Sequence, residues 1–508
     1  MRRWAALLLL CWACDEPAPL PPLPSTFPGL VAVSDNAPWN SSCQGPGRGG
    51  TVFPNAEVEP SIAIDPTNPQ HLIGVWQQDR WSNGGSNGIV SAATFDGGHT
   101  WTRSTAKFSR CTGGSYDRAT DPWVSIGPGG TAWQIAYVFD ESAPNRAMLV
   151  SRSTDGGRTW QDPHQLQRDT DPDLAMDKET VTADPLDPLF AYTVWDRLTG
   201  FTIANNPLGT GPVWFARTTD GGESWETARQ IYDPGPDTQT VSNQIVVLPD
   251  GTLVDLLVVI TENSKPAPKA TVSVLRSTDR GVSWSTAAIP VGDAEFVGVN
   301  DPKNGRGIRT GSVVPAIAVD RANGALYVAW EDAQFSKMER DGIALSKSTD
   351  GGLSWSKPPL QVNGAPAVPA FTPALAVASN GSVAVTYYDF RNDDPSDSGH
   401  LMVTQWLATS TDGGATFADT MMGGPFDLRS APLEHGAYFL GDYQALVSAG
   451  SVFLPFFVAV PGSGPSSVYF RPAGAATVGR GVLSVARSEA QQLWRGARER
   501  WRFGTLFK

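Results

Sequence analysis

Charged side chains stand at the ends of short apolar runs in this chain, where they could carry chemistry. Arg80, Arg197 and Arg391 each come just after such a run and close behind an acidic residue. If the three arginines converge, they could clamp a carboxylate or sulfate bidentately. Neighbouring carboxylates could then serve as acid and base. The candidate acids are Asp79, Asp121, Glu179, Asp196, Asp389 and Asp442. The alternative is that pairs such as Asp79–Arg80 and Asp389–Arg391 are surface ion pairs that close loops.

A repeated box sets the frame that must position these residues. Six copies of Ser/Thr-x-Asp-x-Gly-x-x-Trp occur, the last ending in Phe417. Their aspartates are Asp96, Asp155, Asp220, Asp279, Asp350 and Asp412, spaced by 59, 65, 59, 71 and 62 residues. We expect each Asp to accept hydrogen bonds from its own turn, with a glycine at positive φ and a buried closing ring. Metal binding or acid–base work by these aspartates is the alternative.

Before each box lies an apolar strand, a turn and a second apolar strand. A seventh such hairpin begins at Asp442 and has no box after it. Hairpin and box together make four antiparallel strands, which is the unit of a β-propeller. The sequence therefore predicts an all-β propeller of seven four-stranded blades, with six as the alternative. The last unit offers three strands, and residues 29–35 could supply the fourth.

Strand polarity predicts where a site lies. The start of the first strand and the end of the second strand share one face of a blade, and the box turn lies on the opposite face. The candidate arginines and acids fall on the first of these faces. Loops on a rigid scaffold commonly carry binding and catalytic residues.

The two ends of the chain differ from the repeats. Arg2, Arg3 and a short apolar run predict a secretory signal over residues 1–14, with Cys14 as a lipoprotein cysteine; simple secretion is the alternative. Residues 15–28 are rich in proline and predict a stiff tether, and residues 29–478 hold the propeller. Residues 479–508 form a basic tail that could be helical, packed or solvated, or lying on an anionic membrane surface. In an exported chain Cys43 and Cys111 are expected to form a disulfide, with two separate thiols as the alternative.

Composition narrows the partners. The net charge of −13 argues against nucleic acid. Five histidines without metal-ligand spacing give no zinc signal, so no cofactor is expected. Loop acids could still hold calcium: Asp169, Asp171, Asp173 and Asp177. We expect a monomer that meets the membrane only through a lipid anchor.

The boxes, their spacing and the inner strands resemble the sialidase (neuraminidase) superfamily over about residues 50–470. In that family an Arg-Ile-Pro motif opens the first inner strand, and here this position reads Val58-Glu59-Pro60. The resemblance implies Asp79 as the loop acid beside Asn83 and Asn87, and Tyr443 with Glu434 as the nucleophile pair. Three tripeptides point to the bacterial sialidase-like secreted group: Asp121-Pro122-Trp123, Asp177-Lys178-Glu179 and Gly441-Asp442-Tyr443.

Two functions follow as expectations. The first is an exported propeller that recognises acidic surface glycans through a central funnel and, as an enzyme, hydrolyses them as an exo-sialidase type of glycoside hydrolase. The second is a non-catalytic envelope propeller that binds a glycan or a protein. Convergence of Arg80, Arg197 and Arg391 in one funnel would favour the first.

Overall fold

The computed structural model describes residues 29–199, 210–261, 269–462 and 464–474. The predicted signal with Cys14, the proline-rich tether and the basic tail lie outside the described residues. Within those that are described, no helix is long and apolar enough to cross a bilayer. Helical turns are limited there to short 3-10 segments: η1 (Ser41–Cys43), η2 (Arg110–Thr112), η3 (Gln334–Ser336) and η4 (Leu428–Ser430).

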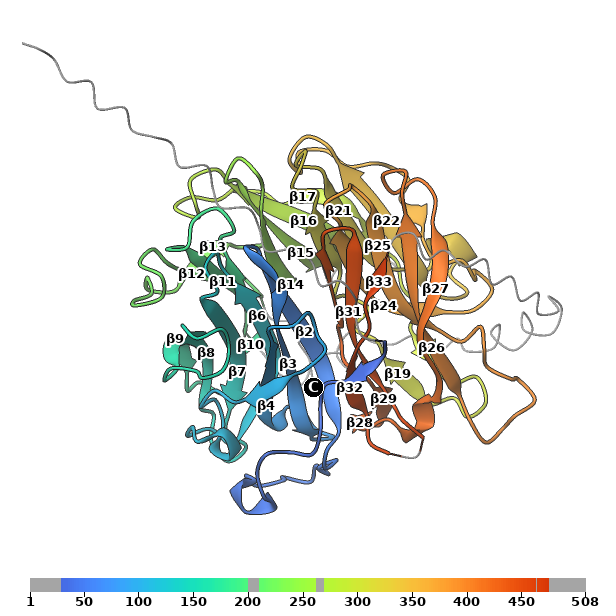
Figure 1. Ribbon diagram of the computed structural model, residues 1–508, viewed down its shortest axis with the longest axis horizontal. Coiled ribbons are helices and arrows are strands. Elements are labelled where there is room, and N and C mark those ends of the chain that lie inside the picture. Colours follow the sequence, from blue (N-terminus) through green and yellow to red (C-terminus); the bar gives the residue numbers. More distant parts are fainter. Residues whose placement is uncertain (1–28, 200–209, 262–268, 463, 475–508) are drawn as a thin grey trace, which may run out of the picture.

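Four-stranded antiparallel units follow one another along the chain, as predicted for a propeller (Figure 1). The first three are β2 (Glu57–Asp65), β3 (Asn68–Arg80), β4 (Ser86–Thr94) and β5 (Thr102–Ser104); β6 (Arg118–Ile126), β7 (Ala132–Phe139), β8 (Arg146–Ser153) and β9 (His164–Asp169); and β10 (Leu174–Ala183), β11 (Ala191–Thr199), β12 (Val213–Thr218) and β13 (Arg229–Tyr232). The next three are β14 (Thr238–Val247), β15 (Leu253–Thr261), β16 (Lys269–Ser277) and β17 (Ile289–Ala294); β20 (Ala316–Val319), β21 (Leu326–Asp332), β22 (Gly342–Ser348) and β23 (Leu360–Gln361); and β24 (Ala370–Val377), β25 (Val383–Asp389), β26 (Met402–Ser410) and β27 (Ala418–Asp427).

The last unit is completed from the other end of the chain. It consists of β30 (Ala445–Ala449), β31 (Val452–Ala459) and β32 (Ser467–Phe470), with β33 (Ala473–Gly474) also on β31. The N-terminal strand β1 (Val31–Ala32) pairs antiparallel with β32, so the predicted fourth strand from residues 29–35 is confirmed. The first strands of successive units contact one another in order, and β30 contacts β2, so the ring closes.

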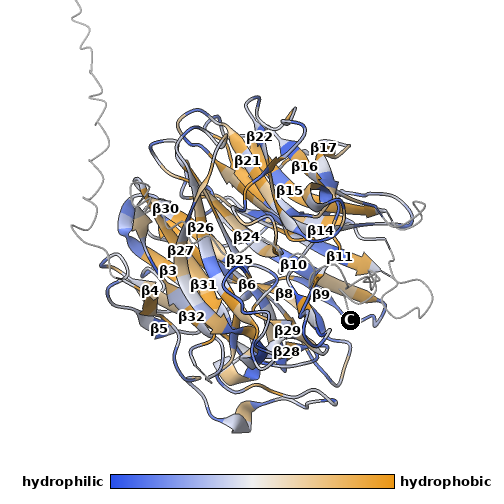
Figure 2. Cartoon of the chain, turned by 90° about the vertical axis from the view of Figure 1, so that its right-hand side faces the viewer, coloured by the Kyte–Doolittle hydropathy of each residue, from blue (hydrophilic) through white to orange (hydrophobic). Residues whose placement is uncertain are grey.

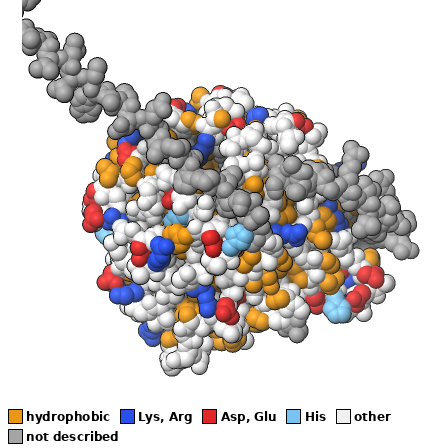
Figure 3. All heavy atoms as spheres, in the orientation of Figure 1, with side chains coloured by type: hydrophobic (Ala, Val, Ile, Leu, Met, Phe, Trp, Pro, Cys, Tyr) orange, Lys and Arg blue, Asp and Glu red, His pale blue; other side chains and the backbone are white. Residues whose placement is uncertain are grey.

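The apolar residues of the strands meet between neighbouring sheets, and the connecting loops are more polar (Figure 2). Trp76, Trp133, Trp195 and Trp330 are fully buried in these layers. Because each apolar layer is shared by two adjacent blades, a single blade cannot bury its faces alone. On the part of one face that Figure 3 leaves visible, acidic and basic side chains are interspersed.

The box aspartates stabilise their own turns, as predicted. In all six boxes Oδ1 accepts the backbone N–H four residues later at 2.9–3.0 Å, and Oδ2 accepts the hydroxyl of that same residue. Hydrogen bonds from the hydroxyl and the backbone N–H of Ser224 bring the pKa of Asp220 to about 2. The carboxylate oxygens are therefore occupied within the turn, which leaves them poorly suited to acid–base work.

The boxes also join each blade to the one before it. The Trp160 ring donates from Nε1 to Ser91 on β4, and Trp284 packs edge-on against Phe215 on β12, with ring centroids 5.4 Å apart. Gly157 has φ of 84°, and a Cβ there would meet Ile73 of the preceding blade at 2.7 Å. The box thus needs its glycine both for the turn and for the close approach between blades.

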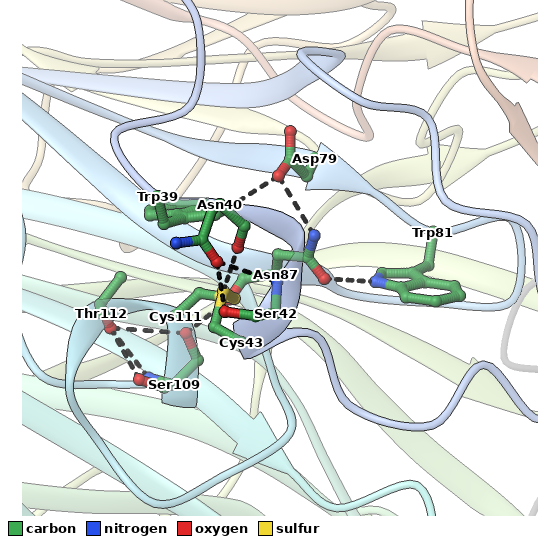
Figure 4. Close-up of a disulfide and its surroundings, with 10 residues drawn as sticks. All are labelled: Trp39, Asn40, Ser42, Cys43, Asp79, Trp81, Asn87, Ser109, Cys111 and Thr112. Atoms are coloured by element: carbon green, nitrogen blue, oxygen red, sulfur yellow. Dashed lines mark hydrogen bonds between the residues drawn. A yellow bond between two sulfur atoms is a disulfide. The ribbon is translucent and has the colours of Figure 1, made fainter.

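A disulfide holds the N-terminal segment to the first blade. Cys43 in η1 and Cys111 in η2 are joined across 68 residues of sequence, as predicted (Figure 4). The bridge links the segment that enters the ring to the loop between the first two blades. It therefore restricts the part of the chain that runs from the closing strand β1 to the first blade.

Asp255 on β15 gives a test of the packing between blades. It is fully buried, and neither carboxyl oxygen has a hydrogen-bond partner among the described residues. Burial, with repulsion from Asp196 second, raises its pKa well above the usual value. We expect Asp255→Val to stabilise the fold by about 1–3 kcal/mol, the cost of an unpaired buried polar group.

The stability that Asp255→Val gains over the wild type should grow with pH. A raised folded pKa means that the folded state binds the proton more tightly than the unfolded state does, so wild-type stability falls as pH rises above about 4. Chemical denaturation at pH 5 and pH 8 measures both variants. Asp255→Asn removes the charge but keeps a polar side chain. It therefore separates the cost of the buried charge from the cost of the buried polar group. A loss of stability in Asp255→Val at both pH values would contradict the argument.

Candidate functional site

Repeated bulges on the first strands turn polar residues toward the centre of the ring. The register of β2, β6, β10, β14 and β24 shifts within each strand, and that of β2 shifts again at its end. At the shift that all five strands share, a non-glycine residue has positive φ, with values of 48–70°: Glu59, Asp121, Lys178, Ser242 and Thr372. Bulges re-aim side chains and often occur beside functional sites. The sequence motifs had included Glu59, Asp121 and Lys178 from the first three bulges, but they did not show the backbone shift.

Lys178 is the centre of the resulting cluster. Its ammonium group contacts Asp121 at 2.5 Å and Asp442 at 2.8 Å, and lies 3.8 Å from Glu59 and 3.9 Å from Asp177. All of these contacts form between different blades except that with Asp177. Although burial opposes its charge, the four carboxyl groups together raise the pKa of Lys178 well above its usual value. Lys178 is therefore charged and fully engaged by acids.

A second cationic pair rests on an added sheet. The strands β18 (Val299–Asn300), β19 (Gly307–Arg309), β28 (Leu433–Glu434) and β29 (Ala437–Phe439) bring together two long connections, and β19 pairs parallel with β29. Arg309 at the end of β19 makes a bidentate contact with Asp442. Glu434 receives Arg80 at 2.7 Å and lies 3.7 Å from Arg309. Both guanidinium groups also lie over the Phe439 ring.

The same groups fix the protonation of the acids. Burial would raise the pKa of Glu434, but Arg80, His435 and Arg309 outweigh it and bring the pKa to about 2. Arg309 and Lys178 likewise lower the pKa of the buried Asp442. Burial and repulsion from Asp121 raise the pKa of Glu59 to about 8. Burial, followed by Asp121, also raises the pKa of Glu179 well above normal.

Beside this cluster lies a small cavity with room of about 30 Å³. It is lined from five blades by Asp121, Trp123, Lys178, Glu179, Thr180, Ser242, Asn243, Gln244, Val314, Pro315 and Tyr443. Three lining atoms have no hydrogen-bond partner among the described residues: Glu179 Oε2, Ser242 Oγ and Asn243 Oδ1. Each of these residues is at least nine-tenths buried. Buried polar atoms without partners indicate a site for a ligand or for bound water.

The three predicted arginines have separate partners. Arg80 joins the central cluster through Glu434. Arg197 makes a bidentate contact with Asp169 on β9, the outermost strand of the preceding blade, at 2.7 and 2.9 Å. Arg391 binds Asp389 at 2.6 Å and Asp419 on the outermost strand β27 at 2.7 Å. The arginines therefore do not share one ligand position, and the ion-pair alternative describes Arg391 and Asp389.

The predicted catalytic residues also have structural partners. Asp79 accepts hydrogen bonds from Trp39 Nε1 at 2.8 Å, Asn87 Nδ2 at 3.1 Å and the backbone N–H of Asn55 at 2.7 Å (Figure 4). Tyr443 donates to the carbonyl of Pro122 at 3.0 Å. Burial, with Glu59 next, raises the pKa of Tyr443 well above its usual value, which disfavours a phenolate nucleophile. Glu434 pairs with the arginines and with His435 rather than with Tyr443.

The remaining predicted acids lie in two places, at the central cavity and farther out in the blades. Asp121, Glu179 and Asp442 meet at the cavity and its cluster. Asp196 on β11 lies in the same blade as Glu179 and reaches the next blade, where it accepts the backbone N–H of Ser242 at 2.9 Å and Asn243 Nδ2 at 2.7 Å. Of the loop acids considered for calcium, Asp169 is bound by Arg197. The described part of the chain contains no group of three or more His, Cys, Asp or Glu side chains able to hold a metal ion.

Arg309 is the central residue that sequence reasoning missed. It lies in the interval of 71 residues between Asp279 and Asp350, the longest between two boxes. That excess length was the available signal, because it marked an insertion on top of the regular blade. Nothing in the sequence showed that the insertion would pair with β29 and bring Arg309 to Asp442.

Comparison with known proteins gives the family. The BNR repeat-like domain matches residues 212–498. The chain belongs to the BNR repeat-like domain family. A comparison with curated proteins gives no match. The sialidase-like superfamily inferred from the boxes is therefore confirmed.

Solved structures agree on the fold of this BNR protein. Polysaccharide lyase Uly1 is similar with a TM-score of 0.52 and 11% identity, covering 88% of this chain and 99% of that chain. The Hadza microbial sialidase Hz136 has a TM-score of 0.46 and 16% identity, covering 80% and 73%. The α-L-arabinofuranosidase Arb93A from Fusarium graminearum has a TM-score of 0.44 and 11% identity, covering 89% and 99%.

Glu434 tests the charge network of the BNR propeller. Glu434→Gln leaves Arg80 without its carboxylate in a buried position, and we expect a loss of about 3–5 kcal/mol at pH 6. The folded pKa of about 2 lies below the unfolded value of 4.5, so the wild type holds this stability above pH 4.5 and loses it as pH falls through 2. Urea denaturation from pH 6 to pH 2 should show a weaker acid dependence in the variant.

Glu331→Gln is the matched control. Glu331 is equally buried, but burial raises its pKa, so the same substitution should cost little at pH 6. Equal destabilisation by the two substitutions would contradict the role given to Glu434.

Proposed function

We propose that this protein binds a glycan, with a polar substituent of one sugar unit reaching into the cavity at the centre of the propeller. The observation that carries the proposal is the trio of unpartnered buried atoms on the cavity lining, Glu179 Oε2, Ser242 Oγ and Asn243 Oδ1. Sugar hydroxyl groups both donate and accept, so they can pair with a carboxyl, a hydroxyl and an amide oxygen at once. A site built to hydrogen-bond hydroxyl groups rejects ligands that lack them.

The other lining residues suit the same class of ligand. Trp123 and Tyr443 lie together on the lining, with ring centroids 5.5 Å apart. Pockets for small ligands combine such aromatic surfaces with a few fixed polar groups. Asn243 is held by Asp196, which accepts from Nδ2 and also from the backbone N–H of Ser242. These two hydrogen bonds hold the Asn243 side chain beside the cavity.

The charges favour a hydroxyl-rich sugar over an acidic one. Each cation of the central cluster already contacts a carboxylate: Arg80 contacts Glu434, and Lys178 and Arg309 contact Asp442. An incoming carboxylate would have to displace one of these acids. An acidic glycan held by three arginines is therefore the less favoured form of the proposal.

A glycoside hydrolase is the second candidate. One observation favours it: the pKa of Glu179 is raised while that of Asp442 is lowered, both beside Lys178, as in acid and base pairs of enzymes. Against it, both oxygens of Asp442 are held by Arg309 and one also by Lys178, so the carboxylate has little freedom to attack. Binding without turnover fits this geometry better.

Export belongs to the same proposal. The basic pair Arg2–Arg3, the apolar run and Cys14 support anchoring of a monomer in the cell envelope, where glycans are available. Fractionation of cells that express the wild type and Cys14→Ser tests the anchor. Release of the variant from the membrane fraction is expected.

Ser242→Ala tests the cavity. The Ser242 hydroxyl makes no hydrogen bond to another described residue, so its removal should leave the melting temperature unchanged. If a sugar hydroxyl pairs with it, we expect affinity for the bound glycan to fall about three- to tenfold, the worth of one hydrogen bond. A glycan array followed by calorimetry measures this, and release of fluorescent aglycones tests hydrolysis.

The matched control is Thr386→Val. Thr386 on β25 also has a buried, unpartnered hydroxyl, but it does not line the cavity. Equal affinities in wild type and Ser242→Ala, or equal losses in the two variants, would contradict binding in this cavity.

A further inference from the structure

The centre of the ring holds more acids than cations. Its carboxyl groups are Glu59, Asp121, Asp177, Glu179, Glu434 and Asp442. Its cations within the described chain are Lys178, Arg80 and Arg309. These three cations pair with Asp121, Asp442 and Glu434. Negative charge that no cation balances therefore remains on the side of the cavity.

Glu179 is the acid on the cavity lining whose charge is not balanced. Its Oε1 accepts the backbone N–H of Tyr137, while its Oε2 has no hydrogen-bond partner among the described residues. Unlike Asp121, Glu179 has no lysine or arginine within ion-pair distance in the described chain. The group is 2% exposed. A buried carboxyl without a cation is costly unless it stays protonated or meets a positive ligand.

The neighbouring atom has the same polarity. Asn243 Oδ1 lines the cavity and is also an acceptor without a partner among the described residues. The nearest strong donor, Lys178, is engaged by Asp121 and Asp442. The residues described around the cavity therefore include two unpartnered acceptors and no free cation, which is the complement of a donor that carries positive charge.

From this arrangement we infer that the cavity selects an amino sugar, with its unacetylated ammonium group on Glu179 and Asn243. The inference rests on the proposed glycan binding and names the sugar class. An ammonium group carries three donors and no acceptor, so it can serve Glu179 Oε2, Asn243 Oδ1 and the Ser242 hydroxyl together. Burial and repulsion from Asp121 raise the pKa of Glu179, so the carboxyl group binds the ammonium group as a carboxylate only after it releases its proton.

A sugar is favoured over a peptide amine by the rest of the lining. Trp123 and Tyr443 offer aromatic surface to a ring, and Gln244 offers a further polar group on the lining. A lysine side chain would bring a single amine on a flexible stem and leave these groups without partners.

Three matched tetrasaccharides test the inference on the full-length protein: one of glucosamine, one of N-acetylglucosamine and one of glucose. They differ only in the group at one ring carbon. We expect the glucosamine form to bind at least tenfold more tightly than either of the others. In Glu179→Gln this preference should disappear, because the amide presents a donor where the carboxylate presented an acceptor.

Glu331→Gln is again the control, since Glu331 is buried in the ring but does not line the cavity; it should keep the preference. Equal binding of the three tetrasaccharides would overturn the amino-sugar inference and leave glycan binding intact. No binding by any glycan would overturn the proposed function itself. Tighter binding of lysine methyl ester, or displacement of the amine by calcium ions alone, would also overturn the inference.

Discussion

The structure depends on satisfying backbone groups where the first strands of the blades crowd around one axis. The bulges on these strands free N–H groups from the ladder, and the buried centre requires acceptors for them. Acidic side chains of the preceding blade supply these acceptors: Asp196 accepts from Ser242 at 2.9 Å, and Glu331 accepts from Thr372 at 2.8 Å. The acids of the centre therefore have a structural task before any chemistry.

The cost of that task is a cluster of buried carboxyl groups, which the protein manages in two ways. Lys178, Arg80 and Arg309 neutralise Asp121, Asp442 and Glu434. Glu59, whose pKa rises to about 8, is held largely protonated at neutral pH instead. The carboxyl groups at the centre are therefore either ionised or protonated. The cavity lies beside protonated ones.

Sequence reasoning reached the architecture because each box carries its own local chemistry. The Ser/Thr, Asp and Gly of one turn suffice to form it, so the repeat predicts hairpins without knowledge of the rest. The closing strand β1 was also predictable because the last unit had only three strands, and the Cys43–Cys111 bridge because two internal cysteines of an exported chain usually pair. The arginine clamp was not, because equivalent positions in successive blades point to different partners: Arg197 reaches back to β9, and Arg391 turns to its own β27.

Arg80 was predicted to bind a ligand, but in the structure it pairs with an acid of the chain itself. In this chain Glu59 stands where the resemblance would place an arginine, and it lies beside Lys178. The insertion that carries Arg309 supplies a replacement cation, but it binds Asp442 directly. Glu434 links the two arginines because it contacts both Arg80 and Arg309. With every guanidinium group of this cluster held by an acid of the chain itself, selectivity must come from the acceptors that remain, Glu179 and Asn243, and these favour a ligand that donates.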